Sequence, residues 1–290
     1  MNKYNAEQKI ILELNKWLDS IGDKELALRV RYNIVVAGGS IASLLYGEEV
    51  NDYDVYIKDR DVLKELTSYY VRSIDTDYKF EVLTEEDKIL NCNKSNHRNL
   101  TYGNINPGQV KVYIPGGGVY INKNQTDKPY EVRVITPNAI TLSNKIQIVL
   151  RFSGTPKEII STFDFAHATN YFTYQDGIVL NNKALECLLT RELIYVGSKY
   201  PLTSVIRTKK FIKRGFDIHG GEYLKMMMQI SDLNLKDPVV LDDQLVGVDI
   251  MIFNQLIREL SELKDISSSK IIEIIDKLYD NNLNNDDNEE

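Results

Sequence analysis

The sequence predicts an α+β protein, in which a half built on a mixed sheet is followed by a mainly helical half. Three observations support this fold class. Two short apolar segments, at 33–37 and 52–57, enclose a glycine turn and about two turns of helix. The segment KIQIVLRF, at 145–152, is rich in β-branched and apolar residues, as a buried strand is. From about residue 183 onward, apolar residues recur at helical spacing.

The first elements follow from local patterns. Residues 5–20 are expected to form an amphipathic helix, because their apolar residues share one face: Ile10, Ile11, Leu14, Trp17 and Leu18. A strand at 33–37 then leads into a helix at 40–46, for which Ser40 is the expected N-cap. In chain order, a strand at 52–57 and a helix at 60–73 complete this part.

The later elements are less regular. Between 77 and 135 we expect short strands and a hairpin around Gly116, Gly117 and Gly118. The segments at 145–152 and 163–168 (FDFAHA) are predicted as strands. The predicted domain boundaries, in order, are a first domain at 1–182, a helical domain at 183–278 and an acidic tail at 279–290.

Composition points to an ordinary globular protein. The 290 residues carry a net charge of −7, but the tail alone holds five acids and no base, and we expect it to be disordered. No apolar run reaches the length of a membrane span, so no membrane partner is expected. Charges interrupt the N-terminal apolar residues, which argues against a signal peptide. Cys92 and Cys187 form no metal-ligand spacing, and an intracellular, cytoplasmic location is the default.

The most informative stretch is VVAGGSIASLLYGEEVNDYDVYI, at 35–57. Asp52 and Asp54 flank Tyr53 in the second apolar segment, and residues two apart on a strand point to one face. Two carboxylates so close repel each other unless a cation lies between them. Taken alone, the glycines could be any strand-to-helix turn, and the aspartates could be an exposed strand end. Together they indicate a site for a hard divalent metal.

This pattern resembles the signature of the DNA polymerase β-like nucleotidyltransferase superfamily, in which Gly-Ser precedes Asp-x-Asp by nine to thirteen residues. The resemblance implies that Gly38, Gly39 and Ser40 bind the nucleoside triphosphate (NTP). It also implies that Asp52 and Asp54 hold two magnesium ions, or manganese in their place. The family takes a third carboxylate from a later strand, and Asp164 in FDFAHA is the matching position for both catalysis and metal binding.

A longer run, over roughly 30–260, is similar to nucleotidyltransferase-like proteins of large tailed phages, which would place the protein in the host cytoplasm. Two other residues of this run have open roles. Gln147 faces opposite to Ile146 and Ile148, so it lines the site or simply faces solvent. His167 is expected to be a hydrogen-bonded structural histidine.

A basic segment in the second half suggests a polyanion site. Residues 191–215 contain seven Lys or Arg and one Glu. On a helix, Arg207, Lys210 and Arg214 share a face. By resemblance, Ser204, Arg207 and Lys210 match positions that hold the triphosphate or the acceptor, although a solvated helix face would show the same charges.

The resemblance therefore implies a metal-dependent, template-independent nucleotidyltransferase. Such an enzyme moves a nucleoside monophosphate from an NTP to an acceptor hydroxyl and releases pyrophosphate. The basic helix at 207–214 favours an RNA 3′ end as the acceptor. A protein or a small molecule as acceptor, and a non-catalytic nucleotide-binding module of the same fold, remain alternatives.

Overall fold

The computed structural model describes residues 2–74, 79–87, 105–114, 119–124, 126–245, 267 and 269–276. The chain divides into two compact units, Met1–Thr190 and Arg191–Glu290. The predicted boundary at 182 differs because helix α7 (Asn182–Thr190) packs on the short helix η1 (Ala166–Ala168) of the first unit. Cys92 and the tail at 279–290 lie outside the described residues, as do Gly116, Gly117 and Gly118. The hairpin predicted around these glycines is wrong, because the strands on its two sides pair elsewhere: Lys111–Tyr113 pairs with Glu81–Leu83, and Tyr120–Ile121 pairs with Val132–Thr136.

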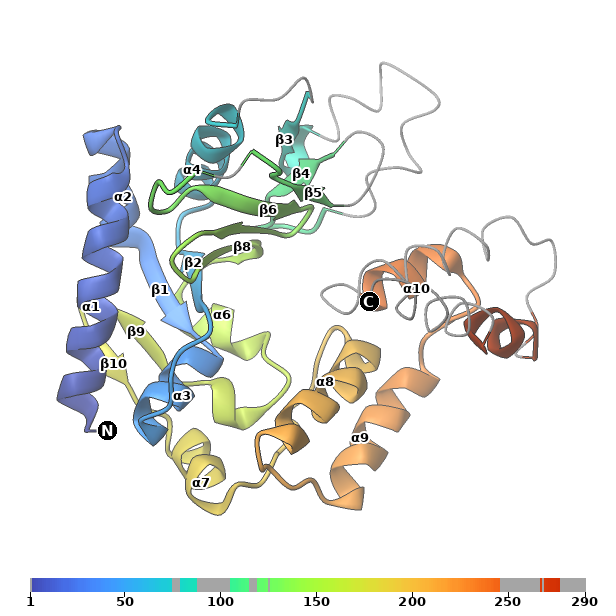
Figure 1. Cartoon of the computed structure of the whole chain (residues 1–290). Helices are drawn as coiled ribbons and strands as arrows, with labels where there is room; N and C mark the ends of the chain where they lie inside the picture. Colours follow the sequence, from blue (N-terminus) through green and yellow to red (C-terminus); the bar gives the residue numbers. More distant parts are fainter. Residues whose placement is uncertain are drawn as a thin grey trace, which may run out of the picture. The chain divides into compact units, whose positions relative to one another are not determined.

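An eight-stranded sheet organises the first unit, with the order β10-β9-β1-β2-β8-β7-β6-β5 (Figure 1). The strand bounds are β1 Ile34–Ala37, β2 Tyr53–Ile57, β5 Tyr120–Ile121, β6 Val132–Thr136, β7 Ala139–Leu142, β8 Ile146–Ser153, β9 Tyr171–Thr173 and β10 Gly177–Val179. β2 and β8 run parallel, whereas the other neighbours in this sheet pair antiparallel. The sheet is therefore mixed, as predicted. A separate pair joins β3 (Glu81–Leu83) to β4 (Lys111–Tyr113).

The main core lies between one face of this sheet and four helices. These helices are α1 (Lys3–Ser20), α2 (Lys24–Asn33), α3 (Gly39–Tyr46) and α4 (Arg60–Arg72). The predicted apolar face of α1 is confirmed, because Ile10, Leu14 and Trp17 are fully buried. The Trp17 indole N–H also donates to the Tyr70 hydroxyl of α4 at 2.7 Å. This buried hydrogen bond fixes α1 against α4. Helix α1 also contacts α2, and the two run side by side in Figure 1.

The opposite face of the sheet carries a smaller apolar cluster. Val35, Ala37 and Tyr56 point there because their neighbours in β1 and β2 point into the main core. Ile159 of helix α6 (Pro156–Ser161) covers them. Helix α6 begins with a capping box between Thr155 and Glu158, which fixes where the helix starts. This face also receives the residues predicted to form the site.

The predicted strand at 163–168 is wrong. The backbone bends at Asp164 and then forms η1, whose end is fixed by the Thr169 hydroxyl donating to the Ala166 carbonyl at 2.8 Å. The apolar alternation in FDFAHA is real, but only Phe165 has extended backbone at a bridge position, and the chain then passes directly into η1. Helix α2 was not predicted, and its last residue is Asn33, where the sequence suggested the start of a strand.

The regular elements described in the second unit are helices, apart from isolated bridges such as the one between Glu192 and Asp217. Its helices are α8 (Pro201–Lys213), α9 (Gly220–Ser231) and α10 (Pro238–Gln244), and residues 269–276 are also helical. The Thr203 hydroxyl of α8 donates to the backbone carbonyl of Gln244, which ties α8 to α10. Among the described residues, no helix has both the length and the apolar character needed to cross a membrane.

Candidate active site at the glycine turn

Asp54 occupies the second position of β2, on the face opposite the main core. Its neighbours Tyr53 and Val55 are buried in that core, so alternation directs Asp54 the other way. Asp54 is half-buried, whereas Asp52 precedes the strand and is exposed. Burial in the core, together with the charge of Glu13, raises the pKa of the Tyr53 hydroxyl.

The loop that carries Asp52 is tied to the start of β8. The N–H of Tyr53, the residue between Asp52 and Asp54, donates to the Lys145 carbonyl at 2.7 Å. The Lys145 ammonium also pairs with Glu49 at 2.5 Å, and its hydrogen bond lowers the pKa of that exposed carboxyl. An exposed pair contributes little to stability. Its effect is to hold the loop before Asp52 close to β8.

The Asp54 carboxylate lies against the glycine turn. Gly38 has φ of 93° and ψ of −152°, a backbone conformation that residues other than glycine rarely adopt. A Cβ added to Gly38 would lie 3.1 Å from Asp54 Oδ2. Gly38 therefore serves two purposes, because it makes the turn and leaves room for the carboxylate. Gly38 has no side chain that could cap helix α3, so the N-terminal N–H groups of this helix have no side-chain acceptor on the cap residue itself.

The sequence predicted Ser40 as the N-cap of α3, and this prediction is wrong. The N-cap is Gly38, and Ser40 lies in the first turn of the helix. The side chain of Ser40 is 3% exposed, and its hydroxyl has no hydrogen-bond partner among the described residues. An unsatisfied buried hydroxyl costs about 1–3 kcal/mol. Its retention beside a helix N-terminus is consistent with a ligand that completes its hydrogen bonding.

Replacing Ser40 with Ala should therefore leave the protein as stable as wild type or stabilise it, by up to about 1 kcal/mol. The same change should weaken binding of an NTP several-fold. Thermal melting without ligand and calorimetry with a non-hydrolysable NTP measure the two effects separately. Ser43 lies on the same helix and is also buried, so Ser43→Ala is the matched control. A Ser40→Ala variant that binds NTP as wild type does would remove this hydroxyl from the site.

Asp164 is 4% exposed and lies at the bend before η1. The segment that follows it contacts the glycine turn, because the Gly38 N–H donates to the Ala168 carbonyl at 3.2 Å. Within the described ranges, no group of three or more His, Cys, Asp or Glu side chains is arranged to hold a metal ion. The joint metal site of Asp52, Asp54 and Asp164 stays a prediction. His167 is buried with its ring tilted against Phe165, which suits a structural residue.

The three residues predicted from the second unit differ in position on α8. Arg207 and Lys210 are exposed, and Arg207 lies over the Phe211 ring at 5.6 Å from its centroid. Ser204 is fully buried, and its hydroxyl donates to the Tyr200 carbonyl at 3.2 Å. The hydroxyl of Ser204 thus satisfies the helix backbone. The exposed positions of α8 are mostly basic, namely Arg207, Lys209, Lys210 and Lys213, with Ile212 exposed among them.

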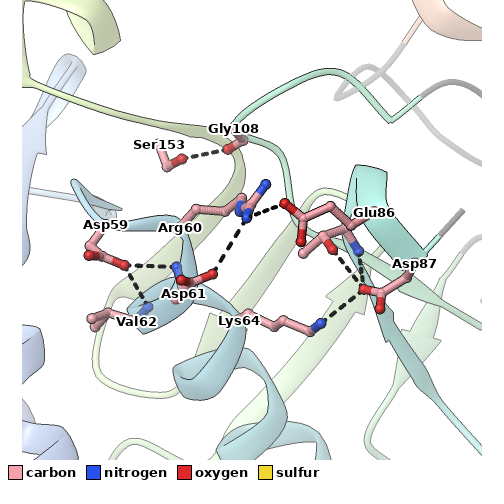
Figure 2. A network of polar contacts seen from close by, with 10 residues as sticks. Asp59, Arg60, Asp61, Val62, Lys64, Glu86, Asp87, Gly108 and Ser153 are labelled. Carbon is pink, nitrogen blue, oxygen red and sulfur yellow. Dashed lines mark hydrogen bonds and ion pairs between the residues drawn. The ribbon is translucent and has the colours of Figure 1, made fainter. Parts of the chain in front are cut away.

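A second polar group lies beyond the C-terminal end of β2 (Figure 2). Asp59 caps α4 by accepting the N–H groups of Asp61 and Val62 at 2.8 and 3.0 Å. Ion pairs at 2.9 Å then join Arg60 to Glu86 and Lys64 to Asp87, so α4 is fixed to the segment after β3. The charged side chains of this network pair with one another or cap the helix. We therefore interpret the network as structural.

Comparisons with known proteins identify a family. The model of the "Gabija anti-defense 2 family protein" matches residues 8–191. The curated protein "Gabija anti-defense 2" of Bacillus phage SPbetaL7 is 21% identical over 277 residues, which cover 94% of this chain and 55% of the relative. The chain thus spans about half the length of that relative. The phage source agrees with the resemblance to phage proteins.

Among solved structures, a Thermotoga maritima CCA-adding enzyme complexed with tRNA has a TM-score of 0.38 at 13% identity, over 86% of this chain and 54% of that one. A Bacillus stearothermophilus CCA-adding enzyme in complex with CTP has a TM-score of 0.38 at 12% identity, over 84% and 51%. The family assignment depends only on the family model. Because that model matches more than half of the chain, the protein belongs to the Gabija anti-defense 2 family.

Proposed function

We propose that this protein is a metal-dependent, template-independent nucleotidyltransferase, and that it acts in the anti-defense role for which its family is named. It would transfer a nucleoside monophosphate from an NTP to an acceptor hydroxyl and release pyrophosphate. One observation carries the proposal. A strand carboxylate, Asp54, lies against a glycine turn that opens a helix, so a metal-binding group and a phosphate-binding backbone meet at one place.

The donor set suits a hard divalent cation. Asp52 and Asp54 supply carboxylate oxygens, and no softer ligand such as Cys or His lies next to them in the chain. Mg²⁺ binds through one or two protein carboxylates and completes its coordination with substrate phosphates and water. Asp52 and Asp54, with Asp164 as the third carboxylate of the proposal, would hold two such ions. When bound, the metal neutralises the charge that develops on the transferred phosphoryl group.

The residues of the glycine turn would bind the triphosphate. Backbone N–H groups at the start of α3 point toward an anion, and the helix dipole favours negative charge there. Gly38 and Gly39 lack side chains that would keep a phosphate away. The Ser40 hydroxyl supplies a further donor. Phosphoryl transfer depends mainly on such positioning and on charge neutralisation.

The test is a label-transfer assay. The purified protein is incubated with each α-labelled NTP, with Mg²⁺ or Mn²⁺, and with total host RNA or host protein extract. We expect label to enter a product only with metal, and the Asp54→Asn variant to give none. Label that ribonuclease removes indicates an RNA acceptor, whereas label that protease removes indicates a protein acceptor. Absence of label in every fraction, together with normal NTP binding, would favour the non-catalytic module.

We favour RNA as the acceptor because the exposed face of α8 is basic. Reversing the charge of Lys210 and Arg214 to Glu should weaken RNA binding and flatten its salt dependence, since each phosphate that a basic side chain neutralises adds to the slope. If one or both of these side chains neutralise an RNA phosphate in the wild type, the double variant should reduce the slope of log K for RNA binding against log salt concentration by about one to two. Binding to a labelled RNA is measured between 50 and 200 mM salt.

The control for this experiment is Lys3→Glu with Lys9→Glu, which changes the net charge equally on exposed positions of α1. If both double variants weaken RNA binding to the same extent, net charge and not the α8 face determines affinity. If neither does, the acceptor is a protein or a small molecule, or the basic side chains serve the triphosphate instead.

A further inference from the structure

Gln147 lies beside Asp54 in the sheet. The parallel pairing of β2 with β8 places Asp54 directly opposite Gln147, and Tyr53 and Val55 opposite Ile146 and Ile148. The flanking residues are all buried in the main core. Alternation therefore directs Gln147 to the same face as Asp54, on a strand about 4.8 Å away. The sequence left open whether Gln147 lines the site or faces solvent, and the register places it next to the carboxylate.

The amide of Gln147 is held from its other side. Thr141 of β7 is the register partner of Gln147, and Gln147 Nε2 donates to Thr141 Oγ1 at 3.2 Å. β8 lies between β2 and β7 in the sheet. The two heteroatoms of an amide branch from one carbon, so directing Nε2 toward β7 leaves Oε1 on the side of β2. A row of polar groups from Asp54 through Gln147 to Thr141 thus crosses three neighbouring strands.

We propose that Gln147 Oε1 is a neutral oxygen ligand for the divalent cation held by Asp54, and that Thr141 is a positioning residue that orients the amide. This inference rests on the proposed function, because it concerns the same metal. Hard cations accept amide carbonyl oxygens as well as carboxylates. A neutral donor adds coordination without adding the repulsion that a further carboxylate beside Asp54 would bring. The hydrogen bond that the Gln147 amide donates to Thr141 resembles the outer contacts that commonly orient metal ligands.

The experiment measures Mn²⁺ binding to the full chain without NTP, by calorimetry and by the electron paramagnetic resonance of free Mn²⁺. Gln147→Ala should raise the Kd for Mn²⁺ about tenfold, and Thr141→Val, which removes only the orienting hydroxyl, should raise it several-fold. Gln147→Glu should lower the Kd because it adds a charge at the ligand position. Without metal, the same Glu should lower the melting temperature because it repels Asp54. Melting in EDTA shows whether each variant folds.

The matched control is Gln175→Ala, a change of the same type at an exposed turn between β9 and β10, which should leave the Kd unchanged. Suppose that Asp54→Asn abolishes Mn²⁺ binding and that neither Gln147 variant alters it. This outcome would overturn the role of Gln147 and leave the proposed function standing. Absence of Asp54-dependent Mn²⁺ binding in the wild type would overturn the metal-dependent function and this inference together. If Gln147→Ala does not fold, Gln147→Glu and Thr141→Val decide the matter.

Discussion

Asp54→Asn is expected to reduce nucleotide transfer at least about a thousandfold, which corresponds to about 4 kcal/mol of transition-state stabilisation. The substitution keeps the shape of the side chain and removes the negative charge that would hold the metal. Because Asp52 lies two residues before Asp54 and also carries a negative charge, removing one charge should not lower the stability of the metal-free fold and should raise it slightly. NTP turnover and melting in EDTA are measured on the same preparation.

The control for this prediction is Asp176→Asn, in the turn before β10, where the carboxylate accepts the Thr173 hydroxyl at 3.0 Å. That contact is structural, so Asn there should lower stability modestly and leave turnover per folded molecule unchanged. If Asp54→Asn behaves in this way instead, Asp54 is a structural residue and the active-site assignment is wrong.

Asp52→Asn and Asp164→Asn test the other two carboxylates by the same pair of measurements. We expect each to abolish transfer without a loss of metal-free stability. Asp164 is buried at a bend, so a structural role would appear as early melting of the Asn variant. Mn²⁺ affinity distinguishes a metal ligand from a residue that acts on the nucleotide, because only loss of a ligand raises the Kd.

Gly38→Ala should have the second large effect, on stability and on activity together. The backbone conformation at Gly38 costs about 1–3 kcal/mol for any residue with a side chain. The new methyl group would also lie 3.1 Å from Asp54 Oδ2, so the carboxylate has to move. We expect a lower melting temperature and, well below that temperature, a transfer rate reduced by at least about tenfold, equal to about 1.4 kcal/mol.

Gly197→Ala separates the two causes. Gly197 has φ of 104°, and an added Cβ there meets nothing within 4 Å. This variant should lose stability through backbone strain and keep normal turnover when folded. Equal turnover for folded Gly38→Ala and Gly197→Ala would show that the contact between the turn and Asp54 has no catalytic consequence.

Several elements could be predicted because their signals are local. The buried face of α1 follows from 3.6-residue periodicity, and Ile10, Leu14 and Trp17 lie where that period places them. The strand, glycine turn, helix and strand between 34 and 57 also follow from neighbouring residues. The placement of Asp54 opposite Tyr53 and Val55 needs only alternation along one strand.

Other local signals were ambiguous, and packing decided between their outcomes. FDFAHA alternates like a strand, yet it bends at Asp164 and continues into η1 at Ala166, so only Phe165 between them has extended backbone. By resemblance, Ser204 was expected to hold the triphosphate or the acceptor. Only the structure shows that its side chain is fully buried and that its hydroxyl donates to the Tyr200 carbonyl. Ser40 could have capped α3 by residue type, whereas the backbone at Gly38 moved the start of the helix.

The sequence by itself thus determined the fold class, the glycine turn and the aspartate pair, since periodicity and turn chemistry operate over a few residues. Only the tertiary structure decided which strands are neighbours. Asp54 and Gln147 are far apart in the chain, and the parallel pairing of β2 with β8 is what brings them into register. The same holds for the Asp54 carboxylate against Gly38 and for the Ala168 carbonyl that accepts the Gly38 N–H. Strand pairing depends on how distant segments bury their apolar faces together, and no short stretch of sequence contains that information.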